Sequence, residues 1–534
     1  MRSGLSRRVM LRATGALALG TTGAAVLAAC GEAKVVTKEV PVEKVVVKEV
    51  QVEKVVTKEV EKVVEKQVPV EKVVTVEKTV TKEVEKIVEK IVEKPPQALT
   101  AIIRHSTDHT SGPRGQAMVW ALEQFGKTYP SIAVKVEPQS DSYMESFGIQ
   151  IAAGTQSETS LLDGGFNQQW VQQGGFAQIN EALKKQKAWD PQKWYFTPDE
   201  YTLNLSDTPS DIQLTGIKGP QWGMPYQGNI NGLIYNMTMM EKAGVPWPTE
   251  GKYGYLKEFL ESLKKVTDAS KEQYGIQMHS NGWIVWGTWA RALQGSGNHM
   301  WRNADATKWD IFNDGGDKGY TLAIDTIHKY KVAPRIEDTK KLAGEIGDPF
   351  SAGKLMISWT GGGIGSQIVR IKDRFKWGLG PMAEGPRGSG PHHFTDQPHM
   401  VTNSAEKNKN VEASTTFVLF FADELVQGRI AIDRGSLPMV KSIIAGKEMA
   451  APPPENHGTY YKKWMDQKGN HHWQNAHPAW WEWYAAFDAS AKGFAGAETA
   501  EQSIRTVIKA SDDVLAKTKK QYDEYKKWLG TLKF

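Results

Sequence analysis

Apolar and polar residues follow three different patterns along the 534 residues of the chain. Residues 1–30 place a few arginines before an uncharged apolar stretch. Residues 31–96 repeat short units of valine, glutamate and lysine and end at two prolines. From residue 97 onward, helical and strand-like periods alternate, as in a folded protein. The chain therefore divides into a leader (residues 1–30), a low-complexity stalk (31–96) and a folded part (97–534).

The folded part begins with a β-α-β pattern. The runs Ala98–Arg104 and Ile132–Val136 are strand-like, and Gly115–Tyr129 between them has apolar residues at helical spacing. The same patterns predict helices at Ser142–Ala153, Lys257–Val266, Thr321–Tyr330, Val411–Ala422 and Ala500–Trp528, and strands at Ser160–Leu162, Leu233–Asn236 and Met356–Trp359. The folded part is too long for one ordinary core, so we expect an α/β fold with two lobes.

The leader has the features of a secretion signal. Four arginines, the last of them Arg12, precede the uncharged stretch Ala13–Ala29, and this order is typical of a signal peptide. The segment SRRVMLR resembles the twin-arginine export motif, with Met10 where phenylalanine is usual. A twin-arginine route would export a folded protein, but the general secretion route is also compatible with this leader.

The leader ends at Cys30 in the segment LAACG, which resembles the lipobox of bacterial lipoproteins. In such a motif the cysteine thiol is diacylated and becomes the new N-terminus. The alternative, a membrane-spanning anchor, is disfavoured because the apolar stretch is short and rich in glycine and alanine. We therefore expect an extracytoplasmic protein that a lipid on Cys30 anchors to the bacterial cell membrane.

The stalk is compatible with two structures. Residues such as Val84, Val88 and Ile91 recur at three- and four-residue spacing, which would suit a helix or a coiled coil. Pro41 and Pro69 interrupt that pattern. A solvated tether without a binding role is the favoured interpretation, and fully extended it could reach about 200 Å. Its role would be to hold the folded part away from the membrane.

Charge and cysteine content exclude several classes of function. Outside the leader and the stalk, the chain has 48 basic and 47 acidic residues, so the folded part lacks the basic surface that nucleic-acid binding requires. Cys30 is the only cysteine. The folded part therefore cannot contain a disulfide, a thiolate metal site or a catalytic thiol.

Several segments of the folded part, in their order, resemble family 1 extracellular solute-binding proteins, which supply ABC importers and include maltose-binding-protein-like receptors. The segments are LEQFGKTYPSIAVKVEP, GMPYQGNINGLIYNMTMMEKAGVPWPTE, FSAGKLMISWTGGGIG, FKWGLGPMAEGPRG, NSAEKNKNVEASTTFVLFF and GSLPMVKS. The resemblance implies a two-lobed periplasmic-binding-protein fold (type II) whose hinge the chain crosses three times. Lobe 1 would comprise residues 97–227 and 399–447, and lobe 2 residues 228–398 and 448–534.

The resemblance also implies a function. We expect a monomer that captures a small-molecule ligand, a carbohydrate such as an oligosaccharide, by lobe closure and delivers it to the transmembrane subunits of an ABC permease. No cofactor and no catalysis are expected. The ligand-binding residues that the resemblance and the tryptophan pattern indicate are Asp163, Gly164, Phe166, Asn167, Tyr226, Gln227, Asn229, Trp286, Trp289, Trp359, Gly361, Gly363, Gln397, His399, Trp481 and Trp483.

Tryptophan is unusually frequent, with 19 residues, and indole rings stack well on sugar rings. The alternative is that most of them pack in cores, but Trp480, Trp481 and Trp483 cannot all face inward on one helix. One departure from the family concerns residues 361–363, three glycines where the family often has Gly-Pro-Trp. The glycines leave room for a bulkier ligand or allow backbone N–H groups to approach it. They lack the spacing of a phosphate-binding loop.

Other functions remain as alternatives. The same fold could bind a peptide, a polyamine or an organic anion, and a stalked lectin or adhesin could retain its ligand without transport. Histidine pairs at residues 392–393 and 471–472 raise the question of a metal, but adjacent histidines rarely share one ion and the HExxH spacing is absent, so no metal site is expected. A glycoside hydrolase would need two carboxylates at a defined distance, which sequence alone cannot identify. The candidate side chains are mostly neutral polar groups and rings, which favours an uncharged polyhydroxy ligand.

Overall fold

The computed structural model describes residues 100–139, 143–162, 167–195, 220–230, 232–248, 252, 254–279, 307–309, 312, 315–360, 364–385, 393–433, 437–450, 453–454, 457–465, 471–472, 479, 482, 485–529 and 531. The chain separates into two units at residues 93 and 94, and all of these residues belong to the second unit. Cys30, the predicted leader and the predicted stalk lie outside the described residues. Within the described part of the chain, no helix is long and apolar enough to cross a membrane.

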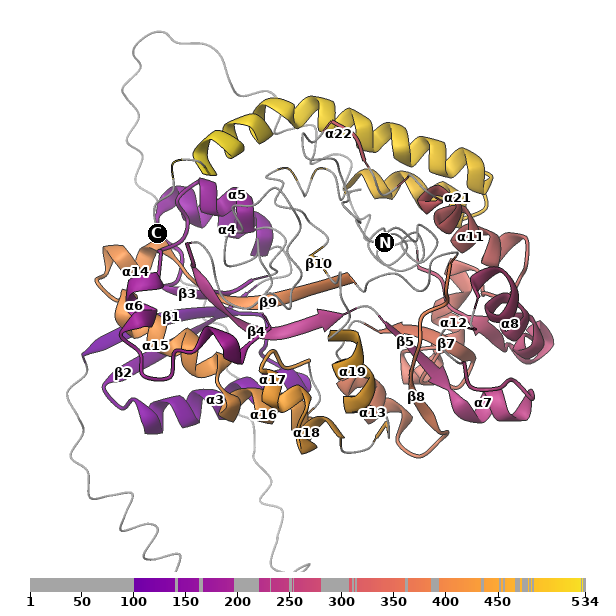
Figure 1. Ribbon diagram of the computed structural model, residues 1–534, viewed down its shortest axis with the longest axis horizontal. Coiled ribbons are helices and arrows are strands. Elements are labelled where there is room, and N and C mark those ends of the chain that lie inside the picture. The colour runs from indigo at the N-terminus through magenta and orange to yellow at the C-terminus, as the bar shows by residue number, and fades with distance from the viewer. Residues whose placement is uncertain are drawn as a thin grey trace, which may run out of the picture. The chain divides into compact units, whose positions relative to one another are not determined.

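The first of two β-sheets has six strands and begins with the predicted β-α-β unit (Figure 1). Strands β1 (Ala101–Thr107), β2 (Ile132–Pro138) and β3 (Thr159–Leu161) are parallel, with β1 in the middle. Strand β9 (His393–Val401) runs antiparallel to β3 and also pairs with β4 (Gly223–Ile230) and β10 (His471–His472). The predicted strand Ala98–Arg104 thus starts three residues later, because pairing with β2 begins at Ala101.

Helices lie on both sides of the first sheet (Figure 1). Helix α3 begins behind Ser111 with a proline in its first turn, where the missing N–H costs no hydrogen bond. Its residue Phe125 packs edge-on against Phe417 and Phe420 of α15 in the core below the sheet. The helices associated with this sheet are α3 (Gly112–Thr128), α4 (Tyr143–Ala153), α5 (Asn167–Gln172), α6 (Asn180–Lys184), α14 (Asn403–Lys407), α15 (Val411–Ala422), α16 (Glu424–Asp433), α17 (Lys441–Ile444) and α18 (Lys447–Ala450).

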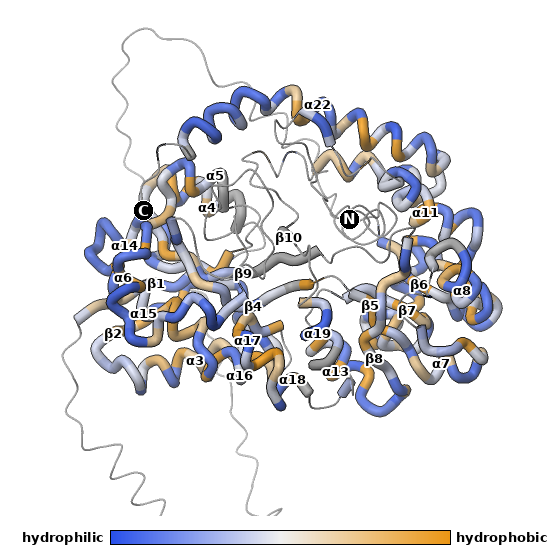
Figure 2. Tube along the Cα trace, viewed as in Figure 1, coloured by the Kyte–Doolittle hydropathy of each residue, from blue (hydrophilic) through white to orange (hydrophobic). Residues whose placement is uncertain are grey.

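The second sheet has four strands in the order β6-β7-β5-β8. Strand β5 (Gly232–Asn236) runs antiparallel to β7 (Leu355–Thr360) and β8 (Trp377–Gly380), whereas β6 (Tyr274–Ile276) is parallel to β7. Nearly all residues of these strands are buried. Figure 2 shows hydrophobic residues along β7 and β8. Continuous burial of this kind is typical of a sheet that is covered on both faces.

Helices around the second sheet complete a second core. They are α7 (Met237–Lys242), α8 (Leu260–Val266), α11 (Gly316–His328), α21 (Ala491–Phe494) and α22 (Ala500–Leu529). Helix α12 (Thr339–Ala343) follows α11 along the chain. The buried residues of α13 (Gly365–Ile371) and α19 (His457–Met465) pack in the first core instead. Helix α22 buries one stripe that includes Ile504, Val507 and Leu515, and it contacts α11. The predicted helices and strands are thus confirmed within a few residues at their ends, and with them the α/β class.

The order of the described strands takes the chain from the first sheet to the second and back again. Strand β4 of the first sheet ends at Ile230 and β5 of the second begins at Gly232; the chain returns between β8 and β9. The predicted lobe boundaries at residues 227 and 398 fall inside the paired strands β4 and β9. Strands β4 and β9 are therefore the elements of the first sheet that directly precede and follow the strands of the second sheet along the chain.

Candidate functional site

The carboxyl ends of parallel strands are the usual place for ligands in α/β sheets. In the first sheet, β1 and β3 end at Thr107 and Leu161, and β9 continues past the end of β3 while paired with β4. In the second sheet, β6 and β7 end at Ile276 and Thr360. The candidate functional site is therefore sought at these two edges.

Five of the predicted ligand residues lie on the β4–β9 pair: Tyr226, Gln227, Asn229, Gln397 and His399. Gln227 lies directly opposite Gln397, and the ring of Tyr226 stacks on His399 with 4.4 Å between the ring centroids. The side chains of Tyr226, Gln227 and His399 are buried, and Gln397 is half-buried. These residues therefore lie beneath the surface at the end of β3, and we call them the β4–β9 floor.

Two histidines that the sequence prediction missed join this floor. The ring of His105 on β1 lies edge-on to His399 with centroids 4.8 Å apart, and its Nδ1 lies 3.0 Å from Thr159 Oγ1. His109 follows β1, and its Nε2 lies 3.4 Å from Gln227 Nε2. The only sign of them in the sequence was their position, close together at the end of the first strand-like run. That position alone does not distinguish buried histidines from surface histidines.

Burial keeps the three histidines neutral. It lowers the pKa of His105 and of His109 from 6.5 to about 3, and it lowers the pKa of His399 well below 6.5. For His109 the neighbouring Arg114 lowers the pKa further, while a hydrogen bond with Gln397 opposes the shift. Burial also raises the pKa of Tyr226. The floor therefore carries no charge on these four rings near neutral pH.

The edge of the second sheet contains a cavity of about 650 Å³. Its wall includes Trp359 and Ser358 from β7, His279 and Gln277 beyond the end of β6, and Gln367 from α13. Burial lowers the pKa of His279, and the nearby Asp348 partly opposes that shift. Asp348 itself accepts hydrogen bonds from the backbone N–H and the hydroxyl of Ser351. The polar groups of the wall are thus mainly neutral: the amides of Gln277 and Gln367, the hydroxyls of Ser358 and Thr339, and the indole of Trp359.

The predicted site residues differ in where the structure places them. Tyr226, Gln227, Gln397 and His399 come together on the β4–β9 pair, and Trp359 lines the cavity at β7. Asn167 begins α5, and Asn229 pairs with Thr395 on the same two strands. The remaining predicted residues lie outside the described residues: Asp163, Gly164, Phe166, Trp286, Trp289, Gly361, Gly363, Trp481 and Trp483.

Gln277, His279 and Gln367 were not predicted, because no motif marks them and only the fold brings them to Trp359. Among the residues that the structure describes, no group of three or more histidine, cysteine or acidic side chains could hold a metal ion.

Comparison with known protein families gives one match that covers more than half of the chain. The model of the family described as bacterial extracellular solute-binding proteins matches residues 108–423. A curated protein of Brucella abortus, named as a binding protein, is 21% identical over 316 residues, which cover 56% of this chain and 67% of that protein.

Solved structures share the fold. An ABC substrate-binding protein of Listeria monocytogenes in complex with cycloalternan has a TM-score of 0.61 at 21% identity, covering 78% of this chain and 98% of that one. The sugar-binding protein MalE of Xanthomonas citri has a TM-score of 0.62 at 14% identity, covering 79% and 99%. At these identities the likeness establishes the two-lobed α/β fold.

Proposed function

Because the chain belongs to the family of bacterial extracellular solute-binding proteins, we propose that it captures a carbohydrate, an oligosaccharide, and delivers it to an ABC permease. Two lobes would close on the sugar, and a lipid on Cys30 would hold the protein at the outer side of the cell membrane. Ligand that touches both lobes favours the closed state, because it gains contacts there that the open state lacks.

The observation that carries the carbohydrate proposal is the chemistry of the cavity beside Trp359. Amide and hydroxyl groups of Gln277, Ser358 and Gln367 can exchange hydrogen bonds with sugar hydroxyls, and the indole can stack on a sugar ring. A polyamine would need several carboxylates and an organic anion would need several cations. The cavity has one carboxylate, Asp348, which is already engaged by Ser351, and one lysine, Lys340.

Further support for the carbohydrate proposal comes from the similar solved proteins. One was solved in complex with cycloalternan, and another is named as sugar-binding. The volume of about 650 Å³ lies in the range of small-molecule sites and would accommodate part of an oligosaccharide. The neutral histidines of the β4–β9 floor are also compatible with an uncharged ligand.

Isothermal titration of the purified protein against a panel of oligosaccharides tests the proposal. We expect heat with at least one oligosaccharide, and we expect Trp359→Ala to weaken that binding more than about tenfold, or about 1.4 kcal/mol. Trp286→Ala should have an effect of similar size if that ring stacks as the family resemblance implies.

The matched control is Trp120→Ala, because Trp120 lies on α3 against Arg429 and away from the cavity. Its affinity for the oligosaccharide should equal that of the unchanged protein. Heat with a peptide, a polyamine or an organic anion but with no carbohydrate would overturn the sugar assignment. An unchanged affinity of Trp359→Ala would remove that ring from the site.

A further inference from the structure

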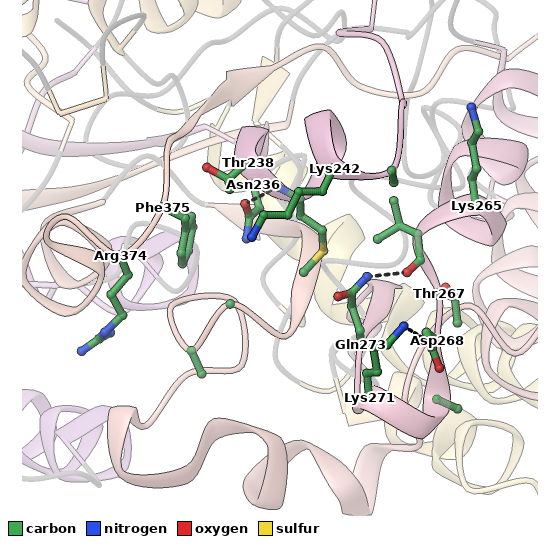
Figure 3. Close-up of a pocket in the computed structure, with 16 residues that line it drawn as sticks. Asn236, Thr238, Lys242, Lys265, Thr267, Asp268, Lys271, Gln273, Arg374 and Phe375 are labelled. Carbon is green, nitrogen blue, oxygen red and sulfur yellow. Dashed lines mark hydrogen bonds and ion pairs between the residues drawn. The ribbon is translucent and has the colours of Figure 1, made fainter.

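A second cavity, of about 840 Å³, lies at the opposite end of the second sheet (Figure 3). It is lined by Asn236 at the carboxyl end of β5 and by Gln273, Gly353 and Phe375, which precede β6, β7 and β8. Because β5 runs antiparallel to β7 and β8, its carboxyl end lies beside their amino ends. We call this cavity the distal cavity, since the candidate solute site lies beyond the carboxyl ends of β6 and β7.

One wall of the distal cavity is the loop between α8 and β6, and hydrogen bonds fix its shape. Thr267 Oγ1 donates to the carbonyl oxygen of Leu263 and accepts from the N–H of Gly275. Gln273 Nε2 donates to the carbonyl oxygen of Val266 at 2.7 Å. This wall is therefore formed before any ligand arrives, which lowers the entropic cost of binding.

The other wall is the start of α7 together with the residues before β8. The N–H of Met239 donates to Asn236 Oδ1, and the N–H of Lys376 donates to Thr238 Oγ1, each at 2.9 Å. Phe375 is half-buried beside this wall and packs edge-on against Phe350. The view in Figure 3 places its ring between Arg374 and Lys242.

Positive charge is concentrated around the distal cavity. Lys242, Lys265, Lys271 and Arg374 line it, with Asp268 as the only lining carboxylate. Asp268 accepts from Lys271 Nζ at 2.6 Å, which neutralises this pair. Within the described part of the chain, no ion pair joins the other three cations to a carboxylate. This local excess contrasts with a folded part whose basic and acidic residues nearly balance.

Two of these three cations have donors available to a ligand. Lys265 Nζ donates to the carbonyl oxygen of Gly244 at the end of α7, so it has a structural role. Lys242 is exposed and has no partner among the described residues. One terminal nitrogen of Arg374 donates to the carbonyl oxygens of Ser351 and Arg370, which leaves the other edge of the guanidinium open.

We propose that the distal cavity binds the phosphate groups of an oligoanion, either a soluble or polymeric phosphate or the headgroup of an anionic lipid. Lysines act as point charges toward phosphate, and one arginine adds a bidentate contact. The carboxylates of an acidic peptide pair best with the bidentate guanidinium of arginine, and the cavity has only one arginine. The lining cations come from different segments of the chain, so a ligand with more than one anionic group could contact several of them at once (Figure 3).

The test compares the purified protein with the double variant Lys242→Gln/Arg374→Gln. Isothermal titration with tripolyphosphate at low ionic strength measures the soluble ligand, and cosedimentation with phosphatidylglycerol vesicles measures the lipid. We expect the double variant to lose at least tenfold in affinity for one or both probes. Because the contacts are solvent-exposed, binding by the unchanged protein should also weaken as salt is added.

The matched control is Lys318→Gln/Arg505→Gln, which removes one exposed lysine and one exposed arginine from α11 and α22. It should bind both probes within twofold of the unchanged protein. Equal losses in the two double variants, or no binding of either probe at low salt, would overturn the proposal. Binding of a polyglutamate peptide in place of both probes would also overturn it.

This inference does not rest on the carbohydrate proposal. Oligosaccharide affinity of Lys242→Gln/Arg374→Gln should equal that of the unchanged protein, because the distal cavity and the Trp359 cavity lie at opposite ends of the sheet. Far-ultraviolet circular dichroism and thermal unfolding, which need no sugar, show whether the double variant is folded. Failure of one proposal therefore leaves a different experimental result from failure of the other.

Discussion

The two sheets reach an uncharged site edge in different ways. The first sheet buries ionisable rings, so His105, His109 and His399 are neutral because water is excluded. The second sheet places mainly neutral side chains around an accessible cavity, such as Gln277, Ser358 and Gln367. The neutral state of the first sheet's histidines therefore depends on pH and on intact packing, whereas the neutral amides and hydroxyls of the second sheet have no charge to lose or gain.

Acidification should produce the largest effect, and it should act on the first sheet. The folded-state pKa of about 3 for His105 and His109 lies below the unfolded value of 6.5, so the unfolded chain binds more protons between these pH values. Stability present above pH 6.5 is therefore lost as the pH falls toward 3. At pH 5 each of the two histidines lowers the free energy of unfolding by about 2 kcal/mol.

Urea unfolding at pH 8 and pH 5 measures this loss, with His399→Phe as the comparison. The Phe ring would stay among Tyr226, Phe417 and Phe421 and would break no hydrogen bond of the described structure, because neither ring nitrogen of His399 has a partner there. The variant should show a smaller difference between the two pH values. An equal difference would mean that His399 is not buried as a neutral ring.

The connection between the sheets gives the next prediction, at Gly232. A Cβ on this residue would lie 2.1 Å from the ring of Trp464 on α19, closer than any normal contact. Gly232→Ala should therefore destabilise the protein by about 1–3 kcal/mol through overpacking. Thermal unfolding measures this loss directly.

The control for this substitution is Gly126→Ala on α3. A Cβ there meets no atom within 4 Å, and alanine favours the helix, so the variant should be as stable as the unchanged protein or slightly more so. If Gly232→Ala behaves like Gly126→Ala, the packing of Trp464 against the start of β5 is not a constraint on the connection between the sheets.

The sequence predicted the elements better than it predicted the site. Val411–Ala422 has the same bounds as α15, because it ends in the unbroken apolar run 417–422 and the polar residues Asn410 and Asp423 flank it. The first strand was displaced by three residues, since its position depends on pairing with β2, which hydropathy does not encode. The resemblance placed Tyr226 and His399 near a hinge, but it did not show that both rings pack against Phe421 of α15, which is distant in sequence from Tyr226.

The smallest expected effect concerns a single hydroxyl in the second sheet, and it tests whether that sheet also relies on buried polar groups. Tyr235 on β5 is fully buried, and its hydroxyl donates to the carbonyl oxygen of Pro381 just beyond β8. Tyr235→Phe removes the donor and leaves that oxygen without this bond, so we expect a loss of about 1 kcal/mol in urea unfolding. Tyr330→Phe, on a half-buried ring, should change the free energy of unfolding by less than about 0.5 kcal/mol.

Because a tyrosine hydroxyl stays protonated at both pH 5 and pH 8, the loss from Tyr235→Phe should be the same at the two values. A loss that grew on acidification would mean that the second sheet also contributes to the pH dependence and that the contrast between the two sheets is wrong.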